Sequence, residues 1–265
     1  MNAKRLTAIV LLCFILVSGV YYFHEHFTIA TFKLKGYDLI ATPHFIILFK
    51  AQSQDSIPIV ANAAEKAYEI VGKYFDFYPK GKTPIVVFPD SISLQAAFNW
   101  PRDENTQGVY FRGVIYVQSP DAWIGQDQDM AKVFFEKGPM VHEYTHLVVD
   151  ALTLGNHPRW FTEGVAQYVE RLVTGYTLAE DFEPAGDKVC SYEEIMCDFD
   201  NLQDVASAYL GALEMTDLLA KEDGMLALKN IMLLLKKGNS ANKIFLQKAA
   251  ALFPEGKNRF VPNTT

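Results

Sequence analysis

A five-residue motif constrains the fold of this chain more than any other feature of its sequence. The letters H-E-Y-T-H at residues 142–146 match the pattern H-E-x-x-H, within a stretch that predicts a helix from Pro139 to about Leu152. Residues four apart in a helix differ by about 40° around the axis and about 6 Å along it. His142 and His146 therefore project from one face and can bind one metal ion. Glu143 lies beside the first imidazole, where it can serve as general base toward a metal-activated water.

A third metal ligand is available in the next predicted helix. Catalytic zinc usually has three protein ligands, and two histidines with one glutamate are a known set. Glu163 stands 17 residues after His146, in a helix predicted from about Phe161 to Val173, and residues 156–158 break the chain between the two helices. An antiparallel return helix would bring Glu163 back over the histidine pair. The sequence thus predicts one zinc ion per chain, held by His142, His146 and Glu163.

Strand and helix signals divide the rest of the chain into a mixed part and a helical part. Strand signals stop near residue 120, and helical periodicity dominates afterwards, which predicts an α+β fold. We expect a linker at 24–40, a catalytic domain at 41–252 that divides near residue 120, and a tail at 253–265. The predicted strands are His44–Phe49, Pro84–Phe88 and a pair broken at Arg112-Gly113 within Gly108–Val117; further helices are expected from Ser56 to about Asp76, at Leu94–Phe98, Leu202–Lys221, Met225–Lys237 and Ala241–Leu252, with an irregular linker from Thr174 to Asp200.

The N-terminus carries an apolar run of membrane-spanning length. Lys4 and Arg5 precede 18 uncharged residues, Leu6–Phe23, which would form a helix roughly 27 Å long. Positive charge ahead of the run predicts a single-pass membrane anchor over residues 1–23 with the catalytic part outside the cytoplasmic membrane. The alternative is a signal peptide cleaved near residues 17–19, which would leave a secreted protein. Both interpretations export the remainder of the chain.

Export affects the interpretation of the cysteines. Cys190 and Cys197 are separated by six residues, and outside the cytoplasm a disulfide bridge between them would persist. Two unbridged thiols are the alternative. Cys13 lies within the apolar run and is interpreted as a membrane-embedded hydrophobic residue.

The two motifs together resemble a known family. H-E-Y-T-H followed by W-F-T-E-G-V-A-Q-Y is similar to the gluzincin metallopeptidases, most closely to the small bacterial "peptidase MA-like" group. The segments A-T-P-H-F-I-I-L-F, P-I-V-V-F-P, G-V-I-Y-V and S-A-Y-L-G-A-L extend this resemblance over roughly residues 41–236. It implies zinc ligands at His142, His146 and Glu163, a catalytic base at Glu143, and a zincin-like fold in which an edge strand of a small mixed sheet lies beside the motif helix.

Other residues near the motifs have weaker signals. The resemblance suggests that Tyr209 donates a hydrogen bond to the tetrahedral oxyanion, and a core or rim position is the alternative. Asp150 and Gln167 each follow a predicted ligand by four residues and could orient a ligand imidazole, with solvated helix positions as the alternative. Trp160 is expected to pack under the ligand helix.

These observations predict a zinc-dependent hydrolase of peptide bonds. The edge strand near Gly113–Val117 would pair with an extended peptide or protein substrate. A catalytically silent binding or assembly module and a zinc hydrolase of non-peptide cell-envelope bonds remain as alternatives. The net charge of −7, from 24 basic and 31 acidic residues, argues against a nucleic-acid partner.

Overall fold

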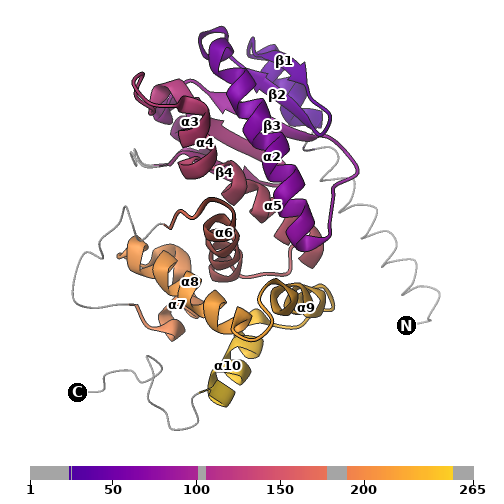
Figure 1. Cartoon of the computed structure of the whole chain (residues 1–265), viewed down its shortest axis with the longest axis vertical. Coiled ribbons are helices and arrows are strands. Elements are labelled where there is room, and N and C mark those ends of the chain that lie inside the picture. The colour runs from indigo at the N-terminus through magenta and orange to yellow at the C-terminus, as the bar shows by residue number, and fades with distance from the viewer. Residues whose placement is uncertain (1–23, 25, 101–105, 178–189, 253–265) are drawn as a thin grey trace, which may run out of the picture. The chain divides into compact units, whose positions relative to one another are not determined.

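The computed structural model describes residue 24 and residues 26–100, 106–177 and 190–252, and these residues form two compact units (Figure 1). The first unit contains the described residues up to Glu65 and Pro79–Phe134, and the second contains Lys66–Tyr78 and the described residues from Phe135 onward. A sheet of five strands lies in the described part of the first unit, and the C-terminal half is mainly helical. The predicted α+β class is therefore confirmed, whereas the predicted division near residue 120 stays a prediction.

The strands of the sheet follow the order β1-β2-β3-β5-β4. The inner pairs β2–β3 and β3–β5 are parallel, and the outer pairs β1–β2 and β4–β5 are antiparallel. Every residue of β3 is buried, as its continuous apolar sequence T-P-I-V-V-F predicts for a central parallel strand. The strands are β1 Asp38–Ala41, β2 Phe45–Phe49, β3 Thr83–Phe88, β4 Gly108–Phe111 and β5 Val114–Gln118.

The predicted pair of strands broken at Arg112-Gly113 is present as a hairpin of β4 and β5, but its edge strand differs from the prediction. Arg112 and Gly113 turn the chain with φ angles of 48° and 85°, a left-handed pair suited to a tight hairpin. The segment Gly113–Val117, predicted as an edge, instead falls almost entirely within β5, which pairs with both β3 and β4. The edge on this side is β4. The sequence pattern cannot distinguish two apolar strands of one hairpin by their place in the sheet.

The segment predicted as a linker at 24–40 has regular structure. Residues 26–34 are helical and lead into β1. Phe32 is 8% exposed, and its ring contacts those of Tyr37, Phe88 and Tyr116. This segment therefore contributes to the core of the first unit.

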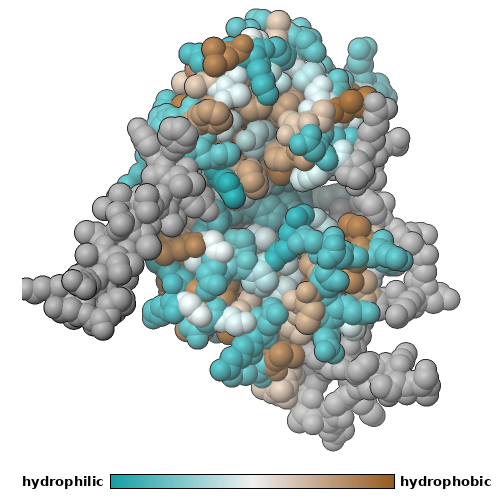
Figure 2. Space-filling view, turned by 180° about the vertical axis from the view of Figure 1, so that it is seen from behind, coloured by the Kyte–Doolittle hydropathy of each residue, from teal (hydrophilic) through white to brown (hydrophobic). Residues whose placement is uncertain are grey.

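On the face shown in Figure 2 the described surface is mostly hydrophilic, with small hydrophobic patches scattered between polar residues.

The helices agree with the predicted ranges within a few residues, and besides the helix over residues 26–34 two short helices were not predicted. Helix α2, Ile57–Phe75, buries Val60, Ala64, Ala67 and Val71 at helical spacing. Helix α7 interrupts the predicted irregular linker, and its start is fixed by reciprocal hydrogen bonds between Ser191 and Glu194. Helix α4 is the second unpredicted helix. The other helices are α3 Ser91–Phe98, α4 Met130–Lys137, α5 Met140–Thr153, α6 Arg159–Thr174, α7 Tyr192–Asp198, α8 Val205–Ala220, α9 Met225–Lys236 and α10 Ala241–Leu252, with short 3-10 helices at Ala51–Ser56, Pro120–Ala122 and Phe199–Asn201.

The predicted membrane anchor is contradicted, and with it the predicted membrane partner and the single-pass localisation. Across the part of the chain that the structure describes, no helix has both the length and the apolar character needed to cross a bilayer. The run Leu6–Phe23 itself lies outside the described residues, as does Cys13.

The predicted disulfide bridge is also absent from the structure. Cys190 and Cys197 are both free thiols. The sulfur of Cys190 lies 3.9 Å from the carbonyl oxygen of Asp204, and its backbone N–H donates to the Ser207 hydroxyl at 2.8 Å. Cys197 lies in the last turn of α7 and is exposed.

Candidate metal centre

The two helices of the motif pair pack against each other within the second unit, joined by the predicted turn. Helix α5 ends at Thr153, and the next two residues, Leu154 and Gly155, have φ angles of 55° and 74° and reverse the chain in a left-handed conformation. The Asn156 amide donates to the carbonyl oxygens of Leu235 at 2.5 Å and Asn239 at 3.2 Å, which fixes the turn. The chain then enters α6 through Pro158. His157 lies in this loop, as expected.

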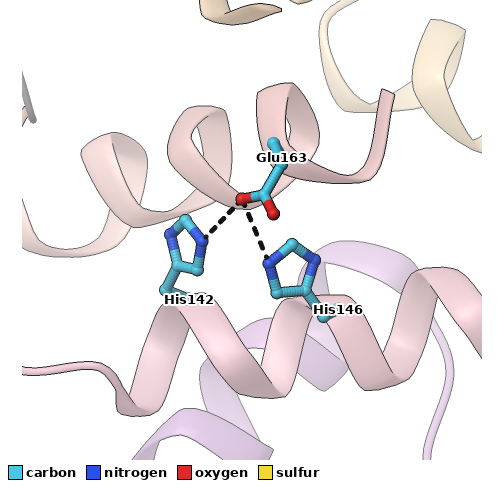
Figure 3. Close-up of side chains that lie close together, drawn as sticks. All are labelled: His142, His146 and Glu163. Carbon is cyan, nitrogen blue, oxygen red and sulfur yellow. Dashed lines mark hydrogen bonds and ion pairs between the residues drawn. The ribbon is translucent and has the colours of Figure 1, made fainter. Parts of the chain in front are cut away.

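This arrangement brings the three predicted ligands to one point. His142 and His146 both extend from α5 toward α6 (Figure 3), and the same oxygen of Glu163 faces both rings. Glu163 Oε2 lies 3.3 Å from His142 Nε2 and 3.4 Å from His146 Nε2. One ligand atom from each residue can be chosen so that all three lie within 4.8 Å of one another. The side chains are largely buried, with 17%, 10% and 6% of His142, His146 and Glu163 exposed.

The far nitrogen of each imidazole also has a partner. His142 Nδ1 lies 3.2 Å from a carboxylate oxygen of Glu170, and His146 Nδ1 lies 2.7 Å from the Thr162 hydroxyl. Such partners orient a ligand ring and hold the tautomer whose Nε2 lone pair faces a metal. Neither partner was predicted from the sequence. Glu170 follows Glu163 by seven residues, two helical turns, and that spacing was the signal that could have found it.

The two residues proposed from sequence as orienting groups contact other parts of the chain. Asp150 Oδ1 lies 3.6 Å from His157 Nε2 in the turn after α5. The Gln167 amide donates to the backbone carbonyl oxygens of Glu163 at 3.3 Å and Tyr209 at 2.9 Å, so it links α6 to α8. Neighbouring segments of the chain thus determine what these two side chains contact.

Arg159 connects the centre to Tyr209. Its Nε lies 2.9 Å from Glu163 Oε1, and its Nη2 donates to the Tyr209 hydroxyl at 3.2 Å. The structure therefore places Tyr209 beside the predicted ligands through one intervening guanidinium group. Burial raises the pKa of Tyr209, and the negative charge of Glu163 adds to that increase. Tyr209 therefore stays a protonated hydroxyl near neutral pH, as a hydrogen-bond donor must.

The hydrogen bonds and charges of the cluster stabilise the protonated form of His142 and the ionised form of Glu163. Burial alone would lower the pKa of His142, but hydrogen bonds to Glu163 and Glu170 outweigh it and raise that pKa well above its ordinary value. Burial likewise opposes ionisation of Glu163, yet the two imidazoles hold its pKa well below the ordinary value. The charge of Glu143, which is 7% exposed, contributes to the shifts of both His142 and Tyr209.

The donor set fits a zinc ion. Two imidazole nitrogens and one carboxylate oxygen converge from two packed helices, and both rings are held from behind. Three protein ligands leave one position for a water or substrate, the pattern of catalytic rather than structural zinc sites. The predicted ligand trio is thus assembled, and Glu143 extends from the same helix.

A close helix–helix approach positions Glu163. A Cβ added to the neighbouring Gly164 would lie 2.2 Å from Thr216 Oγ1 and 2.3 Å from the Ala212 carbonyl oxygen, so only glycine allows α8 to come this near to α6. Trp160 is buried, whereas its position under the ligand helix stays a prediction. It is 1% exposed, and its indole N–H donates to Asn242 Oδ1 in α10 at 2.7 Å.

Comparison with known proteins gives distant structural likenesses. No protein-family model matches the chain, and no curated protein does. One similar solved structure is the native yeast LTA4 hydrolase, with a TM-score of 0.48 and 17% identity over 83% of this chain and 36% of that one. Another is the native leukotriene A4 hydrolase from Saccharomyces cerevisiae, with a TM-score of 0.43 and 15% identity over 84% of this chain and 37% of that one. The chain spans little more than a third of either protein, so its function must be argued from its own site.

Proposed function

We propose that this chain is a zinc-dependent peptidase of the gluzincin type, resembling the small bacterial "peptidase MA-like" group in its motif pair. The observation that carries the proposal is the convergence of His142, His146 and Glu163, with both imidazoles held from behind by Thr162 and Glu170. A histidine with a purely structural role does not require a second imidazole and a carboxylate oxygen to converge on its Nε2. Peptides and proteins are the proposed substrates. An edge strand as substrate partner, and its position beside the motif helix, remain predictions.

The chemistry divides among the residues of the centre. When bound by His142, His146 and Glu163, zinc would polarise the scissile carbonyl and make a water molecule more acidic. Glu143 takes a proton as the water oxygen attacks the carbonyl carbon. It returns that proton to the leaving nitrogen when the carbon–nitrogen bond breaks, so the reaction yields a carboxylic acid and an amine. Tyr209 donates a hydrogen bond to the carbonyl oxygen as that oxygen gains negative charge.

The buried position of Glu143 suits it to this role. Its side chain is 7% exposed, and its charge acts on both His142 of the proposed ligand trio and Tyr209. A carboxylate so placed lies close to the groups among which the proposed proton transfer occurs. A catalytically silent module would have no use for a buried base in addition to three ligands.

Replacing Glu143 with glutamine tests the proposal. Glu143→Gln preserves side-chain size and leaves the three ligands intact, so zinc content should equal that of the wild type. Loss of the general base should lower peptide turnover about 10²- to 10⁴-fold. Glu69→Gln is the matched control, because Glu69 is an exposed glutamate on α2, and its turnover should be unchanged.

Both variants are compared with the wild type for zinc content by elemental analysis and for cleavage of a peptide library. Equal zinc with turnover lost only in Glu143→Gln supports the mechanism. Equal zinc with turnover retained would exclude Glu143 as the base. A wild-type protein that binds no transition metal would refute the metal centre itself.

A further inference from the structure

Arg159 binds two proposed members of the centre with different nitrogens of one guanidinium group. Its Nε contacts Glu163 Oε1 at 2.9 Å, and its Nη2 donates to the Tyr209 hydroxyl at 3.2 Å. Its Nη1 lies 3.4 Å from Asp200 Oδ1. A guanidinium group is planar and permanently charged. The three contacts therefore hold Glu163, Tyr209 and Asp200 in fixed directions around Arg159.

We propose that Arg159 is a positioning residue that restricts Glu163 to one ligand oxygen and directs the Tyr209 hydroxyl proton toward the substrate. The inference rests on the proposed function, because it assigns Arg159 a task at that centre. No part of the H-E-x-x-H or W-F-T-E-G pattern includes this arginine, which immediately precedes the second motif.

The first half of the proposal concerns the two oxygens of Glu163. Oε2 faces both imidazoles at 3.3 and 3.4 Å, whereas Oε1 is bound to Arg159. A carboxylate with both oxygens free can bind a metal with both and occupy an additional position. A catalytic zinc site needs that position for water or substrate. By holding Oε1, Arg159 keeps Glu163 a one-oxygen ligand.

The second half concerns the single proton of the Tyr209 hydroxyl. The hydroxyl oxygen accepts a hydrogen bond from Arg159, and arginine has no acceptor atom, so the hydroxyl proton must point elsewhere. The residue is held in place by its carbonyl bond from Gln167 and by a ring contact with Phe199 at 5.3 Å between centroids. The proton is therefore available to a substrate oxygen that gains negative charge.

An ordinary ion pair between residues four apart on a helix would explain less. Such a pair stabilises the helix without influencing a metal or a neighbouring hydroxyl. Arg159 is half exposed, but its partner Glu163 is 6% exposed and faces the imidazoles. The two explanations therefore differ in their effect on metal coordination, which can be measured without any substrate.

The first experiment replaces zinc with cobalt(II), whose visible absorption is stronger at four-coordinate than at five-coordinate sites. Arg159→Met removes every donor while preserving most of the side-chain length. We expect it to weaken the visible bands, as a second oxygen of Glu163 joins the metal, and we expect Arg159→Lys to do so partly. Arg171→Met is the matched control, because Arg171 is also on α6 and is ion-paired, but with Asp217. Its spectrum should equal that of the wild type.

The second experiment is kinetic and tests the link to Tyr209. Losing one donor to a developing negative charge costs about 10²- to 10³-fold in kcat, which is the loss expected for Tyr209→Phe. Arg159→Met should lower kcat about tenfold or more with KM little changed, and it should have a smaller effect in the Tyr209→Phe background. Circular dichroism of each variant checks folding, and Arg159→Lys replaces Arg159→Met if the latter does not fold.

Each outcome supports or overturns one half of the proposal, either the one-oxygen role of Glu163 or the link to Tyr209. Unchanged cobalt spectra in both folded Arg159 variants would overturn the one-oxygen role of Glu163. Losses in kcat that multiply independently in the double variant would overturn the link to Tyr209. A wild-type protein that binds neither zinc nor cobalt would overturn the proposed function and this inference with it, which separates that failure from the other two.

Discussion

Glu170 provides a quantitative test of how the centre is held. Its carboxylate lies 3.2 Å from His142 Nδ1, and it is 7% exposed. Glu170→Gln keeps the shape of the side chain and an oxygen that can accept the Nδ1 hydrogen, but it removes the negative charge. Because His142 itself is unchanged, the variant isolates the effect of the Glu170 charge on zinc binding by His142.

The magnitude follows from the type of hydrogen bond that is lost. A bond to a charged group contributes about 1.5–3 kcal/mol, and a neutral one about 0.5–1.5 kcal/mol, so the change costs about 1–1.5 kcal/mol. Since about 1.4 kcal/mol is a factor of ten, zinc should bind about tenfold more weakly. That value lies at the lower end of the 10- to 100-fold losses typical when the partner of a ligand histidine is changed.

Zinc affinity is measured by competition with a chelator, at one pH, for the wild type and the variants. Asp217→Asn is the control, because it also removes a carboxylate paired with α6 but contacts Arg171 instead of an imidazole. Its zinc affinity should not change. The reasoning fails if folded Glu170→Gln binds zinc as tightly as the wild type. It also fails if Asp217→Asn weakens binding equally, because the effect would then be one of general charge.

Two further predictions concern stability. Gly164→Ala should lower the free energy of unfolding by about 1–3 kcal/mol, because its Cβ would overlap Thr216 and Ala212. Urea denaturation measures this loss, and an unfolding midpoint equal to that of the wild type would show that α8 can move aside. Burial opposes ionisation of Glu65, but bonds from Thr42 and His44 outweigh it and lower its pKa. Its stabilisation is therefore present above the ordinary pKa near 4.5 and is lost as the pH falls through the folded value, so wild type and Glu65→Gln should converge in acid. A stability difference that grew in acid would contradict this sign.

Local patterns predicted the elements of this fold well because each depends on nearby residues. The range Ala241–Leu252 was predicted as a helix with the bounds that the structure has. Helix α7 was missed although Ser191 and Glu194 form a capping box, because a short acidic segment has too little apolar periodicity to be recognised as a helix. The helix over residues 26–34 was missed because Phe32 matters only through the aromatic cluster that it joins.

The predictions of a membrane anchor and of a disulfide bridge were less successful than the predictions made from the spacing of residues along a helix. The bridge between Cys190 and Cys197 was argued from the predicted export of the chain, and both cysteines are free in the structure. The anchor was argued from hydropathy, and no helix among the described residues could cross a membrane. Neither inference used the packing of the folded chain.

The sequence by itself determined that the three candidate ligands would meet, because helical periodicity fixes how residues of one helix point. Four-residue spacing set His142 and His146 on one face of α5, and the break at residues 156–158 returned Glu163 to them. Only the tertiary structure decided which side chains support those ligands. Residues at both four- and seven-residue spacing from Glu163 were available in α6. The close approach of α8 at Gly164 leaves the Gln167 amide bonded to the Tyr209 carbonyl, while Glu170 contacts His142. That choice depends on how nearly two helices approach and at what angle they cross, which no local pattern specifies.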